Sequence, residues 1–336
     1  MVINLSTRFT SAVNNLKSRD ERKKRRAVRE LFEFDDHSNL TSFIPLLDDK
    51  DPWYRTKAID AFRTWSTRMD VLSLEPLIKH KNIEYNRVAA NLLEKFAAKN
   101  TDLVKLLFSN DDSICKTKAA EFILRANDEQ GFFEELIQLK NSRLKIIALQ
   151  SKYSNRTVLV KALEDESTKV VEQSLVMLIQ MEHKIEGEVI DSLTKRGVKL
   201  SLLIPYLVKH YPDKLVDSIS NINKLETKIL VDALLKQCED ISQEPIRSLI
   251  SNKKHIIVGR WLQGKKGKDV DELRWNIIAD DNVDEIERSR FIERLFSRCD
   301  EEEVIAKAEE VSRNSESELI RITAHNLSTA KDRGQT

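Results

Sequence analysis

Glycine and proline are scarce in this sequence of 336 residues, with 7 and 6 occurrences, and the first glycine is Gly131. Sheet proteins rich in tight turns need more of both, because these residues supply the backbone angles of such turns. A phosphate-binding loop needs several glycines whose amides converge at a helix start, and GKKGK at 264–268 lacks the required spacing and the following Ser or Thr. The scarcity predicts helices joined by short polar turns and argues against a nucleotide-binding loop.

Cysteine and histidine are also few, and they are scattered. The cysteines form an odd set without disulfide or metal-ligand spacing, namely Cys115, Cys238 and Cys299. The histidines occur singly, so none forms an i, i+4 ligand pair on one helical face: His37, His80, His183, His210, His255 and His325. The chain also lacks a Gly-x-Ser-x-Gly elbow for a nucleophilic serine. We therefore predict no metal, no small-molecule cofactor and no catalytic centre, in a reducing, cytoplasmic setting.

Long apolar runs are missing as well. No stretch approaches the roughly 20 apolar residues that a membrane-spanning helix needs. Residues 1–26 lack the continuous apolar segment and small-residue cleavage site of a secretory signal. We expect no membrane association.

Charge is abundant and unevenly distributed. Charged residues make up 33% of the chain, yet the formal net charge is only +1. Residues 269–318 contain 17 Asp and Glu against 7 Lys and Arg, so this stretch carries a net charge of −10 and the rest of the chain is basic. Such a distribution can orient a charged partner during association.

The sequence repeats a helical hairpin. Residues 40–47 have apolar residues at helical spacing, a polar break follows at 48–51, and a second helical period occupies 52–65. Pro52 stands where the second helix would begin, a position that needs no backbone donor. The pattern returns at intervals of about 30 residues, a length typical of helical repeat units. In the next copy Arg87 takes the place of Arg55.

Small residues recur at equivalent places in the second helix of successive copies. They allow two helices to approach closely, and in this sequence they are Ala58, Ala61, Ala90, Ala119, Ala120 and Ala148. A single hairpin cannot bury its apolar face, so neighbouring copies are expected to stack and share a core.

This pattern resembles the HEAT repeat family. The first helix ends in Leu-Leu-Asp-Asp at 46–49, an Asp-Pro turn follows at Asp51 and Pro52, and Arg55 lies four residues after the turn aspartate. The match is good for 36–66, fair to about residue 180 and loose afterwards. The resemblance implies an all-α fold, an armadillo-type α-solenoid with a right-handed superhelix, in which Asp51 and Arg55 help tie neighbouring units.

We expect one continuous array over 1–336. Residues 1–34 would form the N-terminal cap, 35–262 the repeats, 263–330 the acidic C-terminal repeats and cap, and 331–336 a frayed tail. Residues 262–275, where Gly264 and Gly267 separate two helical patterns, are interpreted as a loop between units.

Two basic clusters are the candidate sites for a partner or a polyanion. Residues 17–30 hold eight Lys and Arg against three acids, and 253–268 hold six with no acid. The candidate residues are Arg22, Lys23, Arg25, Arg26, Arg29, Lys253, Lys254, Arg260, Trp261, Lys265, Lys266 and Lys268. A solvated face of the capping helix explains the first cluster equally simply. Trp261 and Trp275, each preceded by an arginine, fit either stacking on a partner or packing between helices.

These features favour a non-catalytic scaffold whose second helices present a curved groove to a protein partner. The alternative is a nucleic-acid-binding protein, such as a repair factor, acting through the two basic clusters. HEAT-like alkylpurine DNA glycosylases share only the architecture, because no motif here places their catalytic acid. An enzyme of that kind is the third hypothesis.

Overall fold

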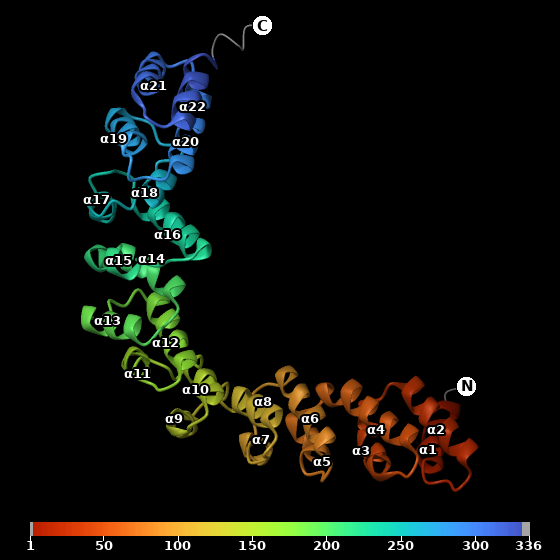
Figure 1. Cartoon of the computed structure of the whole chain (residues 1–336). Helices are drawn as coiled ribbons and strands as arrows, with labels where there is room; N and C mark the ends of the chain where they lie inside the picture. The colour runs from red at the N-terminus through yellow and green to blue at the C-terminus, as the bar shows by residue number, and fades with distance from the viewer. Residues whose placement is uncertain (1–2, 331–336) are drawn as a thin grey trace. The chain divides into compact units, whose positions relative to one another are not determined.

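The computed structural model describes residues 3–330, and every regular element in this range is helical (Figure 1). It has 22 α-helices and six short 3₁₀ helices, and no β-strand occurs among the described residues. The all-α prediction is confirmed. The predicted tail at 331–336 and the first two residues of the predicted cap lie outside the described residues.

The chain divides into two compact units between Ser174 and Leu175, within helix α12 (Thr168–Gln180). The α-helices of the first unit are α1 (Ile3–Asn15), α2 (Glu21–Phe34), α3 (Leu40–Phe43), α4 (Pro52–Trp65), α5 (Glu75–Ile78), α6 (Ile83–Leu92), α7 (Thr101–Phe108), α8 (Ser113–Ile123), α9 (Gln130–Gln138), α10 (Ser142–Leu149) and α11 (Arg156–Ala162). Its 3₁₀ helices are η1 (His37–Asn39), η2 (Ile44–Asp48), η3 (Ser66–Arg68), η4 (Val71–Leu74) and η5 (Leu93–Lys95).

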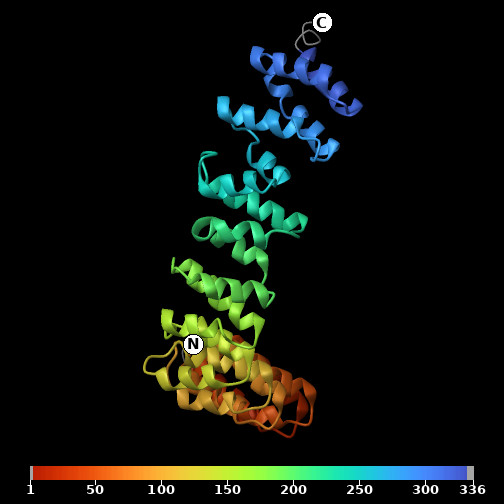
Figure 2. The ribbon, with the colours of Figure 1, turned by 60° about the vertical axis from the view of Figure 1, so that its left-hand side comes forward.

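The second unit contains five successive hairpins. Its helices are α13 (Gly187–Lys195), α14 (Leu200–His210), α15 (Pro212–Ser218), α16 (Lys224–Gln237), α17 (Glu244–Ser251), α18 (His255–Trp261), α19 (Lys268–Ala279), α20 (Glu285–Glu293), α21 (Glu302–Asn314) and α22 (Glu318–Ser328), with η6 (Phe296–Arg298) after α20. Figure 2 shows these hairpins following one another along the unit.

Helices of the same rank pack on one another within each unit. We call α2, α4, α6, α8 and α10 the second helices of the first unit, and α14, α16, α18, α20 and α22 those of the second unit. In the first unit α6 packs on α8, and α8 packs on α10. In the second unit α14 contacts α16, α16 contacts α18, and α20 contacts α22, while the first helices α15 and α17 contact each other. The two ranks of the second unit therefore lie in separate rows (Figure 1).

Short polar residues start the second helices of the first unit. Each accepts a hydrogen bond from a backbone N–H of the first turn, which satisfies a donor that the helix itself leaves free. The caps recur at about the repeat interval and are Asp20, Asp51, Asn82, Asp112 and Asn141. The small residues predicted for close helix approach are buried behind them, including Ala58, Ala61, Ala90, Ala119, Ala120 and Ala148.

Ion pairs connect consecutive hairpins through these caps. Arg25 on α2 donates to Asp51 at 2.9 Å, and Arg87 on α6 donates to Asp112 at 2.7 Å. Asp51 therefore links α2 to the turn before α4. Arg55 acts within its own turn, where it donates to the carbonyl oxygens of Asp49 and Lys50 at 2.7 and 2.9 Å.

We expect Asp112→Ala to lower the free energy of unfolding by about 1–2 kcal/mol, because it removes both the cap of α8 and the partner of Arg87. Asp112→Asn keeps the cap and should cost less.

The Arg87 guanidinium and the backbone N–H of Cys115 lower the pKa of Asp112 to about 2. The ionised carboxylate therefore stabilises the fold above its ordinary pKa, and this contribution is lost as pH falls from about 4 toward 2. Urea unfolding of both variants across this pH range measures the effect; a gap between wild type and Asp112→Asn that persists at pH 2 would contradict it.

Candidate binding surface in the second unit

The first basic cluster lies on α2, where several of its members are already paired. Arg25 pairs with Asp51, and Arg26 donates to Glu30 at 3.0 Å. The Arg25 guanidinium also lies 5.3 Å from the centre of the Trp53 ring. Arg22, Lys23 and Arg29 are exposed, and no acidic partner for them occurs within residues 3–330. Arg25 thus serves a contact between hairpins, Arg26 pairs within α2, and Arg22, Lys23 and Arg29 remain open.

The second basic cluster does not present its tryptophan to a partner. Trp261 is fully buried, and its indole N–H donates to the carbonyl of Cys238 at 3.3 Å. Lys265 covers the ring, with its ammonium 4.3 Å from the centroid. Trp275 is also buried. Stacking of these rings on bases or peptides is therefore excluded, and both rings serve interhelical packing.

The remaining cations of this cluster are spread over several surfaces. Lys253 and Lys254 lie in the turn before α18, and Lys268 is the exposed first residue of α19. Lys265 and Lys266 lie in the loop between α18 and α19, which occupies residues 262–267. The predicted loop is too long, because residues 268–275 belong to α19.

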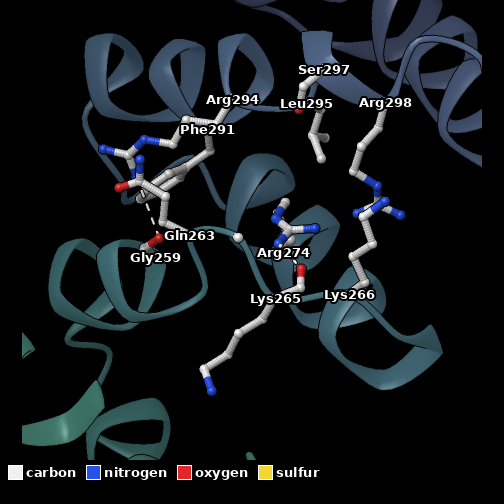
Figure 3. A pocket seen from close by; sticks show the side chains of 11 residues that line it. Gly259, Gln263, Lys265, Lys266, Arg274, Phe291, Arg294, Leu295, Ser297 and Arg298 are labelled. Atoms are coloured by element: carbon white, nitrogen blue, oxygen red, sulfur yellow. Dashed lines mark hydrogen bonds between the residues drawn. The ribbon is translucent and has the colours of Figure 1, made fainter. Parts of the chain in front are cut away.

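A cavity of about 320 Å³ lies between this loop and α20 (Figure 3). Its lining includes five cationic side chains, namely Lys265, Lys266, Arg274, Arg294 and Arg298. No acidic residue is among its described lining residues. One wall depends on Gly259, because a Cβ there would lie 2.1 Å from the Phe291 ring. The glycine lets α18 and α20 approach at this point.

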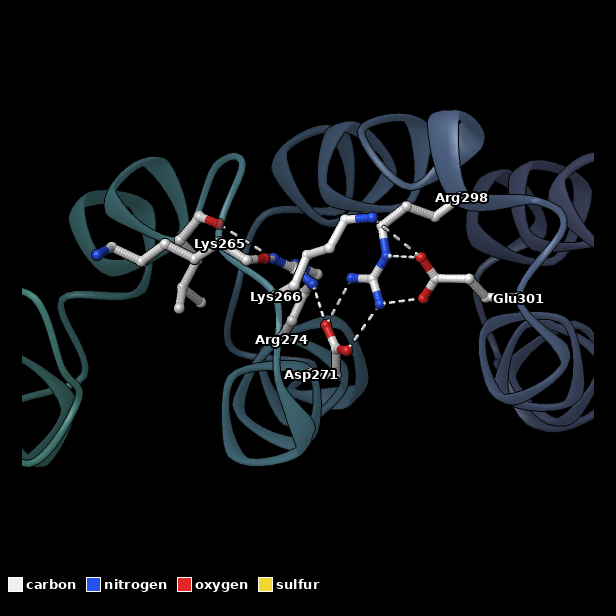
Figure 4. A network of polar contacts seen from close by, with 7 residues as sticks. Lys265, Lys266, Asp271, Arg274, Arg298 and Glu301 are labelled. Carbon is white, nitrogen blue, oxygen red and sulfur yellow. Dashed lines mark hydrogen bonds and ion pairs between the residues drawn. The ribbon is translucent and has the colours of Figure 1, made fainter.

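Two of these arginines are neutralised by a network beside the cavity (Figure 4). Arg298 makes two hydrogen bonds of 2.8 Å to Asp271, and it also donates to Glu301 at 2.9 Å. Arg274 donates to Asp271 and to the carbonyl oxygens of Leu262 and Lys265, both at 3.0 Å. The network fixes α19 and the loop before it to η6, and its role is therefore structural.

The pKa values in this network reflect the pairing. The Arg298 guanidinium holds the pKa of Asp271 below its usual value, despite burial that acts in the opposite direction. Arg298 and Lys266 lower the pKa of Glu301 to about 2. Burial lowers the pKa of Arg274, although an arginine remains charged under all ordinary conditions.

A second cavity of about 630 Å³ adjoins the first and is lined by three successive second helices. From α16 come Lys228, Val231, Asp232 and Leu235; Arg260 lies on α18 and Gln263 just after it; Glu287, Arg290 and Arg294 come from α20 and its end. Gln263 and Arg294 line both cavities. The two hollows therefore form one surface on the second-helix row.

Arginines converge on this surface. Burial lowers the pKa of Arg294. The nearby charges of Arg260 and Arg290 lower this pKa further, and the charge of Glu287 raises it. Arg294 donates a weak hydrogen bond of 3.4 Å to the Gly259 carbonyl, and its guanidinium lies 5.2 Å from the Phe291 ring centre. Arg290 pairs with Glu287 at 2.5 Å. A cluster of guanidinium groups with few carboxylates is suited to bind carboxylate or phosphate groups.

The first unit has a related hollow on its own second helices. A cavity of about 470 Å³ is lined by α8, α10 and the residues just after them: Glu121, Leu124, Arg125, Ile147, Gln150, Ser151 and Lys152. Its charge is more balanced and its cations are fewer than those in the second unit.

Other chemistry finds little support in the described part of the chain. No group of three or more His, Cys, Asp or Glu in residues 3–330 is arranged to hold a metal ion. Burial raises the pKa of the Cys115 thiol to about 12 and that of Cys238 in the same direction, so both thiols are poor nucleophiles. None of the described helices is both long and apolar enough to span a membrane.

Sequence reasoning identified Arg260 but missed its neighbours Lys228, Leu235, Arg290 and Arg294. Arg290 and Arg294 lie in the acidic stretch 269–318, where the net charge conceals them. Arg290 and Arg294 are four residues apart, a spacing that places them on one helix face, and Arg260 lies about one repeat interval earlier. This combination is the signal that could have found them.

Comparisons with known proteins leave the family open. No protein-family model matches the sequence, and no curated protein matches it. Among solved structures, the crystal structure of an engineered protein aligns over 97% of this chain and 97% of its own, at 14% identity and a TM-score of 0.11. A score this low carries no argument about fold or function.

Proposed function

We propose that this protein is a non-catalytic scaffold that binds a protein partner along the second helices of a HEAT-like α-solenoid. The hairpin period, the stacked second helices and the cavities lined by them in each unit support this architecture. Repeat arrays of this type offer long surfaces for docking because each unit contributes one more helix face.

The position of exposed apolar residues in the second unit carries the proposal. Six large exposed apolar side chains lie on its second helices: Leu225, Leu235, Ile256, Ile286, Leu319 and Ile322. Among the described residues of this unit, the first helices α13, α15, α17, α19 and α21 have none. Of the other exposed apolar side chains described in this unit, Met181 lies just after α12 and Phe296 lies in η6. Exposed apolar residues gathered on one row of helices mark an interaction surface, whereas solvated faces carry them singly.

Ile256→Asp combined with Ile286→Asp is expected to abolish binding of the cellular partner, because a charge in an apolar contact stays unpaired on binding. The tagged full chain would be used to capture proteins from nuclease-treated native lysate, with quantification by mass spectrometry. Ser192→Asp with Ser251→Asp adds the same charge to the first helices α13 and α17 and serves as the control.

Equal capture by wild type and the Ile256→Asp/Ile286→Asp variant would overturn the proposal, as would loss of capture in the control alone. A mobility-shift series on a labelled oligonucleotide tests the nucleic-acid alternative. Steep weakening between low and moderate salt, removed by neutralising Arg22 and Arg29, would favour that alternative over a protein partner.

A further inference from the structure

An aliphatic row runs across the second-helix face of the second unit. Leu225, Ile256, Ile286 and Leu319 are each the second residue of α16, α18, α20 and α22. Their side chains are exposed by 66%, 41%, 52% and 39%. Because they hold the same position in successive second helices, they place one exposed apolar side chain per hairpin along one edge of this face.

A cationic row follows about one helical turn later. Lys228, Arg260 and Arg290 lie three or four residues after the aliphatic row, a spacing that places them on the same helix faces. All three line the larger cavity. Within residues 3–330 no carboxylate pairs with Lys228 or Arg260. Two of the three cations in this row therefore lack a described counter-charge, while Arg290 pairs with Glu287.

The same surface is poorly suited to nucleic acid. Single-stranded nucleic acid binds through aromatic rings that stack on bases, and Trp261, Trp275 and Phe291 are all buried. Asp232 and Glu287 also line the larger cavity and repel any anion, so spaced carboxylates that meet only the cations fit this surface better than a continuous phosphate backbone. Adjacent aliphatic and cationic rows match a peptide that carries aliphatic and acidic side chains.

We propose that this face binds an extended acidic segment of a protein partner, with Glu or Asp at about every third residue and aliphatic residues between them; this rests on the proposed function. Packed helices lie about 8–10 Å apart. A polyproline-II segment advances about 9 Å per turn of three residues, so each turn meets one second helix. Its acidic edge faces Lys228, Arg260 and Arg290, and its aliphatic edge faces Leu225, Ile256 and Ile286.

The test uses fluorescein-labelled peptides that repeat Glu-Leu-Pro or Gln-Leu-Pro, with the full chain titrated in fluorescence anisotropy. Wild type is expected to bind the Glu peptide about ten-fold more tightly than the Gln peptide, because charge-assisted hydrogen bonds form only with the first. Lys228→Gln combined with Arg260→Gln should remove this preference. Neither residue has a described ion pair, so the variant is expected to fold; circular dichroism checks this.

Arg22→Gln with Arg29→Gln provides the matched control, since both are exposed cations of α2 without an acidic partner in the described residues. Its preference should equal that of wild type.

Absence of binding, equal affinity for the two peptides, or an equal loss in the control would overturn the inference. Tighter binding of a labelled single-stranded oligonucleotide, lost in Lys228→Gln/Arg260→Gln, would also overturn it. If both peptides bind equally and Ile256→Asp/Ile286→Asp abolishes both, the acidic specificity fails while the proposed docking function stands.

Discussion

Replacing Trp65 with alanine is expected to lower the free energy of unfolding by about 3–5 kcal/mol. The indole is fully buried between two aromatic neighbours from the preceding elements. It stacks on Phe32 with 5.0 Å between ring centroids, and it meets Phe43 edge-on at 5.3 Å. Truncation would leave a large cavity where α2, α3 and α4 join, and rigid helices cannot collapse to fill it.

The indole N–H of Trp65 also makes a hydrogen bond, and a matched variant can separate the contribution of this bond from that of ring packing. It donates to Asp35 at 2.8 Å, and Arg68 donates to the same carboxylate at 2.9 Å. Asp35 has φ of 47° at the end of α2, so this contact also holds a left-handed residue in place. Trp65→Phe keeps most of the packing and loses the hydrogen bond, and it should cost about 1–2 kcal/mol.

Urea unfolding followed by circular dichroism measures both Trp65 variants, and amide hydrogen exchange localises the effect. Protection should fall across α2 to α4 and should stay unchanged across α18 to α20, which serve as the internal reference. A cost below about 1 kcal/mol for Trp65→Ala would show that the cluster is loosely packed. Equal costs for the two variants would assign the effect to the hydrogen bond.

The all-helical class follows from the sequence because caps and apolar spacing act locally. Asp51 and Pro52 predict the start of α4, and the structure begins that helix at Pro52. The predicted first helix at 40–47 is wrong as a single element. It is divided into α3 and η2 at Ile44, since Pro45 lacks the N–H that would continue an α-helix.

The surface of the second unit was less accessible to sequence reasoning. Trp261 and Arg260 are adjacent in sequence, yet one is in the core and the other lines a cavity, because successive helical residues point about 100° apart. A charge sum over 269–318 treats that stretch as acidic, although Arg290 and Arg294 place positive charge on one face of α20. Which helix face stays uncovered depends on the packing of neighbouring hairpins, and a local pattern does not contain that information.

Asp271→Asn is expected to lower the free energy of unfolding by about 3 kcal/mol, because it leaves two largely buried arginines short of a counter-charge. The side chains of Arg274 and Arg298 are about 9% and 10% exposed, and both donate to this carboxylate. The carbonyl contacts of Arg274 and the Glu301 contact of Arg298 remain, which places the cost at the lower end for a broken buried pair. Lys266→Gln is the control: Lys266 is 68% exposed, so its pair with Glu301 should contribute little to stability.

The cost of Asp271→Asn should depend on pH in a defined direction. Since Arg298 lowers the pKa of Asp271 in the folded protein, the ionised carboxylate stabilises the fold above its ordinary pKa of 3.8. That stabilisation is lost as pH falls below about 4 and the native carboxylate takes up a proton. The difference between wild type and Asp271→Asn, measured by urea unfolding, should therefore be largest near neutral pH and shrink in acid. A difference that stays constant down to about pH 2 would mean that the second acceptor oxygen of Asp271, and not its charge, holds α19 against η6.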